Sequence, residues 1–209
     1  MALNNYANLV ASIRSWSKRA DLTDLEIDDF IDICESAMYS NIDEPLEIRG
    51  NETRATASTS ITTRYMQLPT GFLNMRSMHI VGDDYQCDVR YQTPEMLVIY
   101  DAEGRPDRFT ITNQIELNRV SDQVYTIEMN YYAKSTALSA SNTTNTVLTN
   151  YPHIYLFGAL WAMAMFSRQE ELSRYYYDSF IGAIRGANKR DRDGRYGPAP
   201  VMRIEGDTP

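Results

Sequence analysis

The chain has 209 residues, of which 43% are hydrophobic and 23% are charged, a composition typical of a folded globular protein and not of a disordered one. It contains no apolar run long enough to cross a bilayer, which excludes a membrane-spanning helix. The formal net charge of −8 argues against a protein that grips nucleic-acid backbones, because such binding needs a basic surface. The length allows one hydrophobic core, or a core with a smaller satellite domain.

Two amphipathic helices are predicted at the start of the chain. In the first, over about residues 4–18, apolar side chains recur at spacings of three and four residues, which places them on one face. The second begins with a capping box, since Thr23 and Glu26 can each accept a hydrogen bond from the backbone amide of the other. Both helices are therefore expected to pack one face against a core.

The second helix has an acidic outer face, with carboxylates four residues apart at Asp24, Asp28 and Asp32. Carboxylates on one face can bind a hard cation, but no histidine or loop ligand accompanies them. We therefore interpret them as a solvated acidic face and predict no metal site. If the chain surrounds DNA, such a face would line the wall of a channel and repel the phosphates.

From residue 44 to residue 134 the helical period is lost, and the sequence is typical of short strands separated by turns. Residues 104–106 form a strong turn signal, and residues 109–117 have the pattern of a hairpin. The clearest half-buried strand is at residues 125–131, where apolar and polar side chains alternate. Several strands at spacings of about eight to twelve residues predict a small sandwich or barrel.

Residues 135–150 are predicted to be a polar linker that returns from the β part to a helical part. A helix beginning near Pro152 is apolar on nearly all sides, so it is expected to be buried. Ser167 and Glu170 have the spacing of a second capping box, which predicts the start of another amphipathic helix. No apolar period follows from residue 194 onward, which indicates an extended tail.

These elements predict an α+β fold in three parts. A four-helix core domain would combine residues 1–43 and 135–193. Residues 44–134 would form the inserted β domain, a small sandwich or barrel. Residues 194–209 would be an extended C-terminal arm.

The sequence shows no motif for catalysis or for a cofactor. His79 and His153 are the only histidines, and neither lies in a metal-binding or catalytic motif. Cys34 and Cys87 are far apart and are expected to be free thiols in a reducing compartment. Isolated glycines do not form a phosphate-binding loop. No catalytic, metal-binding or cofactor-binding residue is predicted.

Two features are candidates for protein–protein contacts. The run Tyr175, Tyr176 and Tyr177 cannot turn all three rings toward the core of one helix, so it indicates either ordinary packing of amphipathic rings or a subunit contact. The tail is rich in basic and aromatic side chains and is either a disordered end or an arm that becomes ordered on a partner protein. The arm candidates are Arg192, Arg195, Tyr196, Pro198, Pro200, Met202 and Arg203.

Over about residues 5–190, a series of short segments resembles the head-to-tail adaptor, or head completion, proteins of tailed bacteriophages. The order and spacing of these segments carry the resemblance, not any one of them. They are Asp21-Leu22-Thr23 before the acidic helix ending at Ala37, Leu68-Pro69-Thr70-Gly71-Phe72, Gly104-Arg105-Pro106, Tyr131-Tyr132 followed by Ala137-Leu138-Ser139, and Tyr151-Pro152-His153-Ile154-Tyr155.

The resemblance implies a virion structural protein without catalysis, assembled in the host cytoplasm and located at the head-tail junction. It would form a homo-oligomeric ring, typically dodecameric, below the portal protein. The helical core would line or approach the channel through which genomic DNA passes without sequence-specific binding. The C-terminal arm would insert between portal subunits, and the other end of the ring would receive a tail or nozzle protein. No membrane partner is expected.

Two alternatives stay open at the level of sequence. One is a hydrolytic enzyme that uses carboxylates of the β domain. The other is a monomeric binding module whose recognition face lies on the β domain. The adaptor interpretation requires the arm for attachment to a partner, whereas a binding module would work without residues 194–209.

Overall fold

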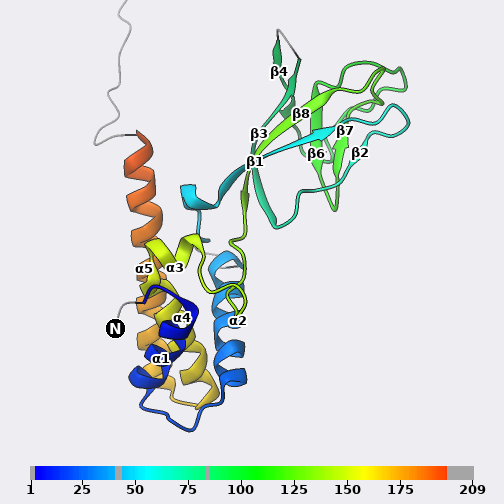
Figure 1. Cartoon of the computed structure of the whole chain (residues 1–209). Coiled ribbons are helices and arrows are strands. Elements are labelled where there is room, and N and C mark those ends of the chain that lie inside the picture. The colour runs from blue at the N-terminus through cyan, green and yellow to red at the C-terminus, as the bar shows by residue number, and fades with distance from the viewer. Residues whose placement is uncertain (1–2, 41–43, 83–84, 197–209) are drawn as a thin grey trace, which may run out of the picture. The chain divides into compact units, whose positions relative to one another are not determined.

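The computed structural model describes residues 3–40, 44–82 and 85–196. The chain divides into two compact units, one formed by residues 1–49 and 135–209 and the other by residues 50–134. The described residues form five α-helices, a short 3-10 helix η1 (Arg49–Asn51) and two β-sheets (Figure 1). The predicted α+β class is therefore confirmed.

The first unit, called the helical unit below, contains all five α-helices. The prediction of four missed a short helix within the segment that the sequence indicated as a polar linker. Asn145 caps this helix by accepting a hydrogen bond from the Leu148 amide at 2.8 Å, and Val147 and Leu148 are buried in the core. Two apolar residues are too few to show a helical period. The helices are α1 (Tyr6–Ser17), α2 (Asp24–Ser40), α3 (Thr146–Asn150), α4 (Pro152–Phe166) and α5 (Glu170–Tyr196).

The predicted capping box at the start of α2 is confirmed. The Glu26 carboxylate accepts a hydrogen bond from the Thr23 amide at 2.7 Å, and Thr23 Oγ1 accepts one from the Glu26 amide at 3.3 Å. These reciprocal bonds satisfy two amides that a helix start otherwise leaves unpaired.

The second predicted capping box is wrong, because Ser167 ends α4 instead of beginning α5. The Ser167 amide donates to Met163 O, so it belongs to the ladder of α4. The Arg168 amide donates to Met165 O at 3.0 Å and the next amide donates to Ala164 O at 2.9 Å, which is the Schellman pattern of a helix end. Arg168 has φ +56°, a conformation that glycine usually occupies there.

The helix α4 is buried on several sides, as its sequence predicts, and it contacts α1, α2, α3 and α5. Gly158 of α4 faces Cys34 of α2 and Phe180 of α5. A Cβ atom at Gly158 would clash with Cys34 Sγ and lie 2.9 Å from the Phe180 ring. Glycine is therefore required at this point by space and not by backbone conformation.

The second unit, called the β unit below, has two four-stranded sheets. Their strand orders are β1-β8-β3-β4 and β2-β7-β6-β5, with all pairs antiparallel except β5 and β6. The strands are β1 (Glu52–Ser58), β2 (Tyr65–Met66), β3 (Phe72–Val81), β4 (Gln86–Asp88), β5 (Arg90–Tyr91), β6 (Arg108–Ile111), β7 (Ile115–Leu117) and β8 (Thr126–Ala133).

The predicted hairpin at residues 109–117 is confirmed as the pair β6 and β7, with Phe109 opposite Leu117. The alternation predicted for residues 125–131 is also confirmed, because Ile127 and Met129 of β8 are buried and the intervening side chains are not. Side chains of both sheets join one hydrophobic cluster. The structure confirms the sheets, and their classification as a sandwich or barrel stays a prediction.

The expected start of the extended arm is wrong by three residues, because α5 continues as a helix to Tyr196. Buried Asn188 and Asp191 hold this last part of α5 against the segment that follows α2, and polar residues of this kind do not show an apolar period. The arm candidates Pro198, Pro200, Met202 and Arg203 lie outside the described residues. No helix in the described part of the chain is both long enough and apolar enough to cross a membrane.

Candidate functional site

The C-terminal half of α5 is fixed to the segment of residues 44–49. The Asn188 side chain accepts a hydrogen bond from the Glu47 amide at 2.9 Å and donates one to Pro45 O at 2.9 Å. Arg49 Nε lies 3.1 Å from the buried Asp191 carboxylate. These contacts extend the helix beyond the apolar core and give its last turns a defined direction.

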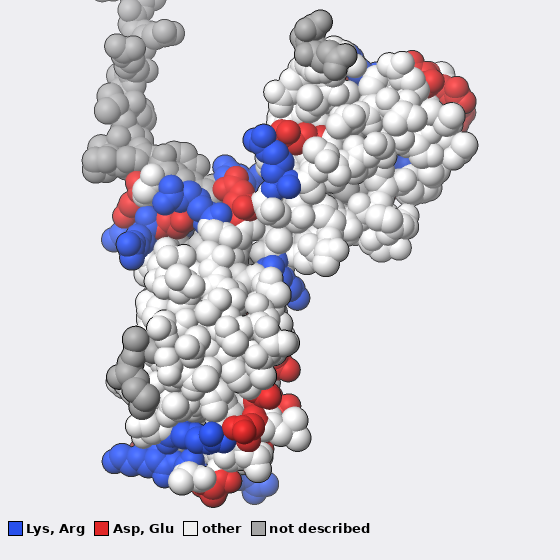
Figure 2. All heavy atoms as spheres, viewed as in Figure 1, with Lys and Arg blue, Asp and Glu red and all other residues white. Residues whose placement is uncertain are grey.

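This end of α5 is rich in basic side chains. Lys189, Arg190 and Arg192 are exposed, and Arg185 is paired with Glu44 at 3.4 Å. Figure 2 shows basic side chains, with acidic ones among them, where α5 ends. Of the predicted arm residues, the structure places Arg192 on the surface of α5. It places Arg195 and Tyr196 in the last helical turn.

The three consecutive tyrosines of α5 have different surroundings. Tyr175 is 64% exposed, Tyr176 packs partly against the core, and Tyr177 lies with its ring 5.3 Å from the Trp161 ring. Tyr175 is therefore the ring most available to another protein. A role of these rings in subunit contact stays a prediction.

The acidic residues of α2 do not form one ligand set. Asp24 pairs with Arg14 at 2.6 Å, and Asp28 accepts a hydrogen bond from the Tyr6 hydroxyl. Asp32 is exposed to solvent. In residues 3–40, 44–82 and 85–196, no three His, Cys, Asp or Glu side chains are placed to hold a metal ion.

A half-buried carboxylate of α2, Glu35, was missed by the sequence analysis. Glu35 accepts hydrogen bonds from the Leu138 amide at 2.9 Å and from the Tyr155 hydroxyl at 2.8 Å. Asn145 Nδ2 donates to Tyr155 Oη at 2.6 Å and also bonds Thr136 O. Burial raises the pKa of Glu35 and, together with the nearby carboxylate, raises the pKa of Tyr155. This network fixes the segment that returns from the β unit to α2 and α4.

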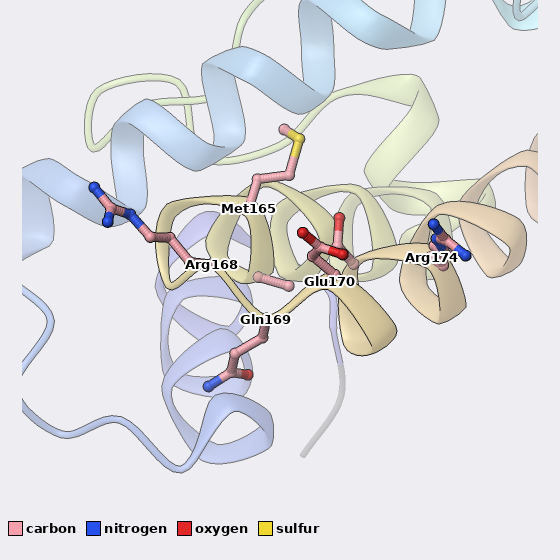
Figure 3. A pocket seen from close by; sticks show the side chains of 7 residues that line it. Met165, Arg168, Gln169, Glu170 and Arg174 are labelled. Atoms are coloured by element: carbon pink, nitrogen blue, oxygen red, sulfur yellow. The ribbon is translucent and has the colours of Figure 1, made fainter.

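The turn between α4 and α5 lines an open surface hollow of about 580 Å³. Its lining includes Met165, Arg168, Glu170 and Arg174 (Figure 3). Figure 3 shows the two arginines on opposite sides of the hollow, with Met165 and Glu170 between them. The sequence offered no motif for this feature, because the hollow depends on the tight end of α4.

The sequence profile of the SU10 adaptor protein family matches residues 4–203, which is nearly the whole chain. The chain belongs to the SU10 adaptor protein family. This confirms the resemblance to phage head-to-tail adaptors and makes the protein a structural adaptor of a bacteriophage virion. A search of curated proteins gives no match.

The histidines and thiols of this adaptor occupy structural positions. His79 Nδ1 lies 2.8 Å from Asp88 Oδ1 across the β3–β4 pair. His153 is exposed in the first turn of α4, where partial desolvation lowers its pKa. Both cysteines are free, as predicted. Cys34 is fully buried, and this burial raises its pKa and keeps the thiol protonated.

The β unit of the adaptor exposes an apolar segment that the sequence analysis did not single out. Met96 is 67% exposed, and Val98, Ile99 and Tyr100 are also exposed. The Arg119 guanidinium lies 4.6 Å from the centre of the Tyr100 ring, which holds one end of the segment. Consecutive exposed apolar side chains of this kind are typical of protein-binding surfaces.

Proposed function

We propose that this adaptor forms a ring, dodecameric in the assembled virion, below the portal protein at the head-tail junction. The ring extends the channel through which genomic DNA passes and offers a docking surface to a tail or nozzle protein. Membership in the SU10 adaptor protein family supports this function and suggests a role without catalysis. The net charge of −8 fits a channel wall along which DNA slides without adhering.

The proposed contact with the portal rests on the structure of the C-terminal end of α5. The helix is fixed to residues 44–49 up to its last turns, where Lys189, Arg190 and Arg192 are exposed. Residues 197–209 follow directly from this fixed helix. We propose that they are the portal-docking arm together with the exposed side chains of the last turns. Arginine and tyrosine are residue types that dominate binding energy at interfaces.

The experiment removes residues 197–209, which leaves α5 complete to Tyr196. We expect the truncated chain to unfold at the same urea concentration as the full chain and to lose co-sedimentation with purified portal rings. Arg192→Ala should weaken the attachment, whereas Arg90→Ala, an exposed arginine of the β unit, should not. Normal attachment by the truncated chain would contradict the proposed role of the arm.

We assign the tail-side contact to the exposed apolar segment of the β unit, because it offers uncovered apolar surface at Met96, Val98 and Ile99. A Met96→Asp variant should still attach to the portal but should no longer recruit the tail or nozzle protein to portal–adaptor complexes. Unchanged recruitment would remove this segment from the proposal.

A further inference from the structure

The outer face of α2 combines acidic and apolar side chains and is not covered by the helical unit. Leu25 is 73% exposed and Ile33 is 41% exposed. Helical spacing places Asp29 and Asp32 on the same face, and both are exposed. Neither carboxylate forms an ion pair with any residue that the structure describes.

The hollow at the α4–α5 turn has the opposite character. Arg168 and Arg174 are exposed on its two sides, and no acidic side chain within the described ranges pairs with either of them. Met165, 44% exposed, lies between them. Glu170 also lines the hollow, so its lining carries two positive charges and one negative charge. This is a basic site with an apolar centre.

These two surfaces cannot meet within one copy of the chain. The ring of Phe30 in α2 lies 5.6 Å from the ring of Phe166 at the end of α4, so α2 turns its Phe30 side toward the α4–α5 turn. Asp29 and Asp32 lie on a different side of α2, about 100° or more away around the helix axis from Phe30 on average. Any contact between the acidic face and the hollow is therefore a contact between two copies.

We propose that the outer face of α2 in one copy docks onto the α4–α5 hollow of a second copy. In this contact the carboxylates of Asp29 and Asp32 meet the guanidinium groups of Arg168 and Arg174, and the apolar side chains of α2 cover Met165. Charge complementarity supports the second copy as the occupant, because this chain carries both halves of the contact. The inference rests on the proposed homo-oligomer and names the surfaces that join its subunits.

The backbone conformation of Arg168 is consistent with a role of its side chain in this contact between two copies. Its left-handed conformation favours glycine, and glycine is the usual residue at this position of a Schellman motif. The chain instead carries a long basic side chain at a strained position, among the residues that line the hollow (Figure 3). In the docked pair this arginine gains an acidic partner.

The test is a pair of complementary charge reversals. One variant carries Asp29→Lys and Asp32→Lys, and the other carries Arg168→Glu and Arg174→Glu. Each variant alone should self-associate more weakly than the parent chain, by on the order of tenfold or more in dissociation constant. When the two variants are mixed in equal amounts, self-association should return to the strength of the parent chain. In the mixture each contact can join one variant to the other, so that opposite charges meet.

A matched control carries Glu95→Lys and Asp101→Lys, the same charge change at exposed positions of the β unit, and should self-associate like the parent. Self-association is measured by sedimentation over a concentration series. A variant with Ser36→Cys and Gln169→Cys in a Cys87→Ser background is also treated with a thiol crosslinker, and it should give crosslinked multimers.

Several outcomes overturn the inference. They are unchanged association of either variant, a mixture that is not rescued, or no crosslinked multimers. If the arginine variant keeps its self-association but loses retention on immobilised DNA, the hollow faces DNA instead. Attachment to portal rings is measured separately, so a chain that docks on the portal but shows none of these effects overturns only the assignment of the subunit contact.

Discussion

The Glu35 network allows a sharp test of how the helical unit is held together. Replacing Glu35 by alanine removes the acceptor for the Leu138 amide and for the Tyr155 hydroxyl. Both of these donors belong to buried residues. A buried donor left without a partner costs about 1–3 kcal/mol, so we expect a loss of about 2–4 kcal/mol in the free energy of unfolding. Glutamine keeps an acceptor oxygen at this position, and Glu35→Gln should cost less than about 1 kcal/mol at neutral pH.

The dependence on pH separates the charge of Glu35 from its hydrogen bonds. Burial raises the pKa of Glu35 in the folded chain above its usual value of 4.5. The folded state therefore binds the proton more tightly, and the stabilisation that results is complete below pH 4.5 and is lost as the pH rises through the folded pKa. Glu35→Gln lacks this contribution, so the advantage of the parent chain over the variant should shrink as the pH rises across that range.

Urea unfolding followed by tryptophan fluorescence measures this effect in the right unit, because Trp16 and Trp161 both belong to the helical unit. The measurement is repeated at several pH values between about 4 and 7, around the usual pKa of a glutamate. A constant difference between the parent and Glu35→Gln at every pH would refute the argument from burial. A loss well below 1 kcal/mol for Glu35→Ala would show that water replaces the missing acceptor.

Further predictions concern positions where a small change of side chain should clearly raise or lower the free energy of unfolding. Gly158→Ala should destabilise the chain by about 1–3 kcal/mol in urea unfolding, because the new methyl group has no space beside Cys34. Gly182→Ala and Gly186→Ala meet open space, so each should raise the free energy of unfolding of the isolated chain by about 0.5–1 kcal/mol; a loss of stability would contradict their exposure. Arg168→Gly should raise the midpoint of unfolding by relieving a strained backbone, while weakening self-association in sedimentation; unchanged stability would show that the strain is negligible.

Elements with a strong local signal could be predicted from the sequence. The buried α4 follows from its apolar residues on all sides, the start of α2 from its capping box, and the strand β8 from its alternation. Each of these signals lies within a few consecutive residues, where one periodicity or one pair of side chains decides the structure. The class of protein followed from the order of several weak segments along the chain.

The features that the sequence did not reveal depend on contacts between distant residues. The last turns of α5 are stabilised by residues 44–49, far away in sequence, so the polar residues that follow Asn188 did not show how far the helix continues. Glu35 looked like one more member of the acidic face, because only the returning segment around Leu138 makes it a half-buried acceptor. The hollow beside Arg168 depends on a tight helix end that has no glycine to mark it.

The strands that begin and end the β unit are direct neighbours, since Glu52 of β1 pairs with Tyr132 of β8. The folded β unit thus brings its own ends together and, for the helical unit, acts as a short connection. If it unfolded, the helical unit would have to close a loop of about 85 residues. The entropic cost would be only about 4 kcal/mol, because that cost grows with the logarithm of loop length. Any fold whose ends lie side by side could occupy this place, so the β unit can in principle be exchanged without a change in the helical unit.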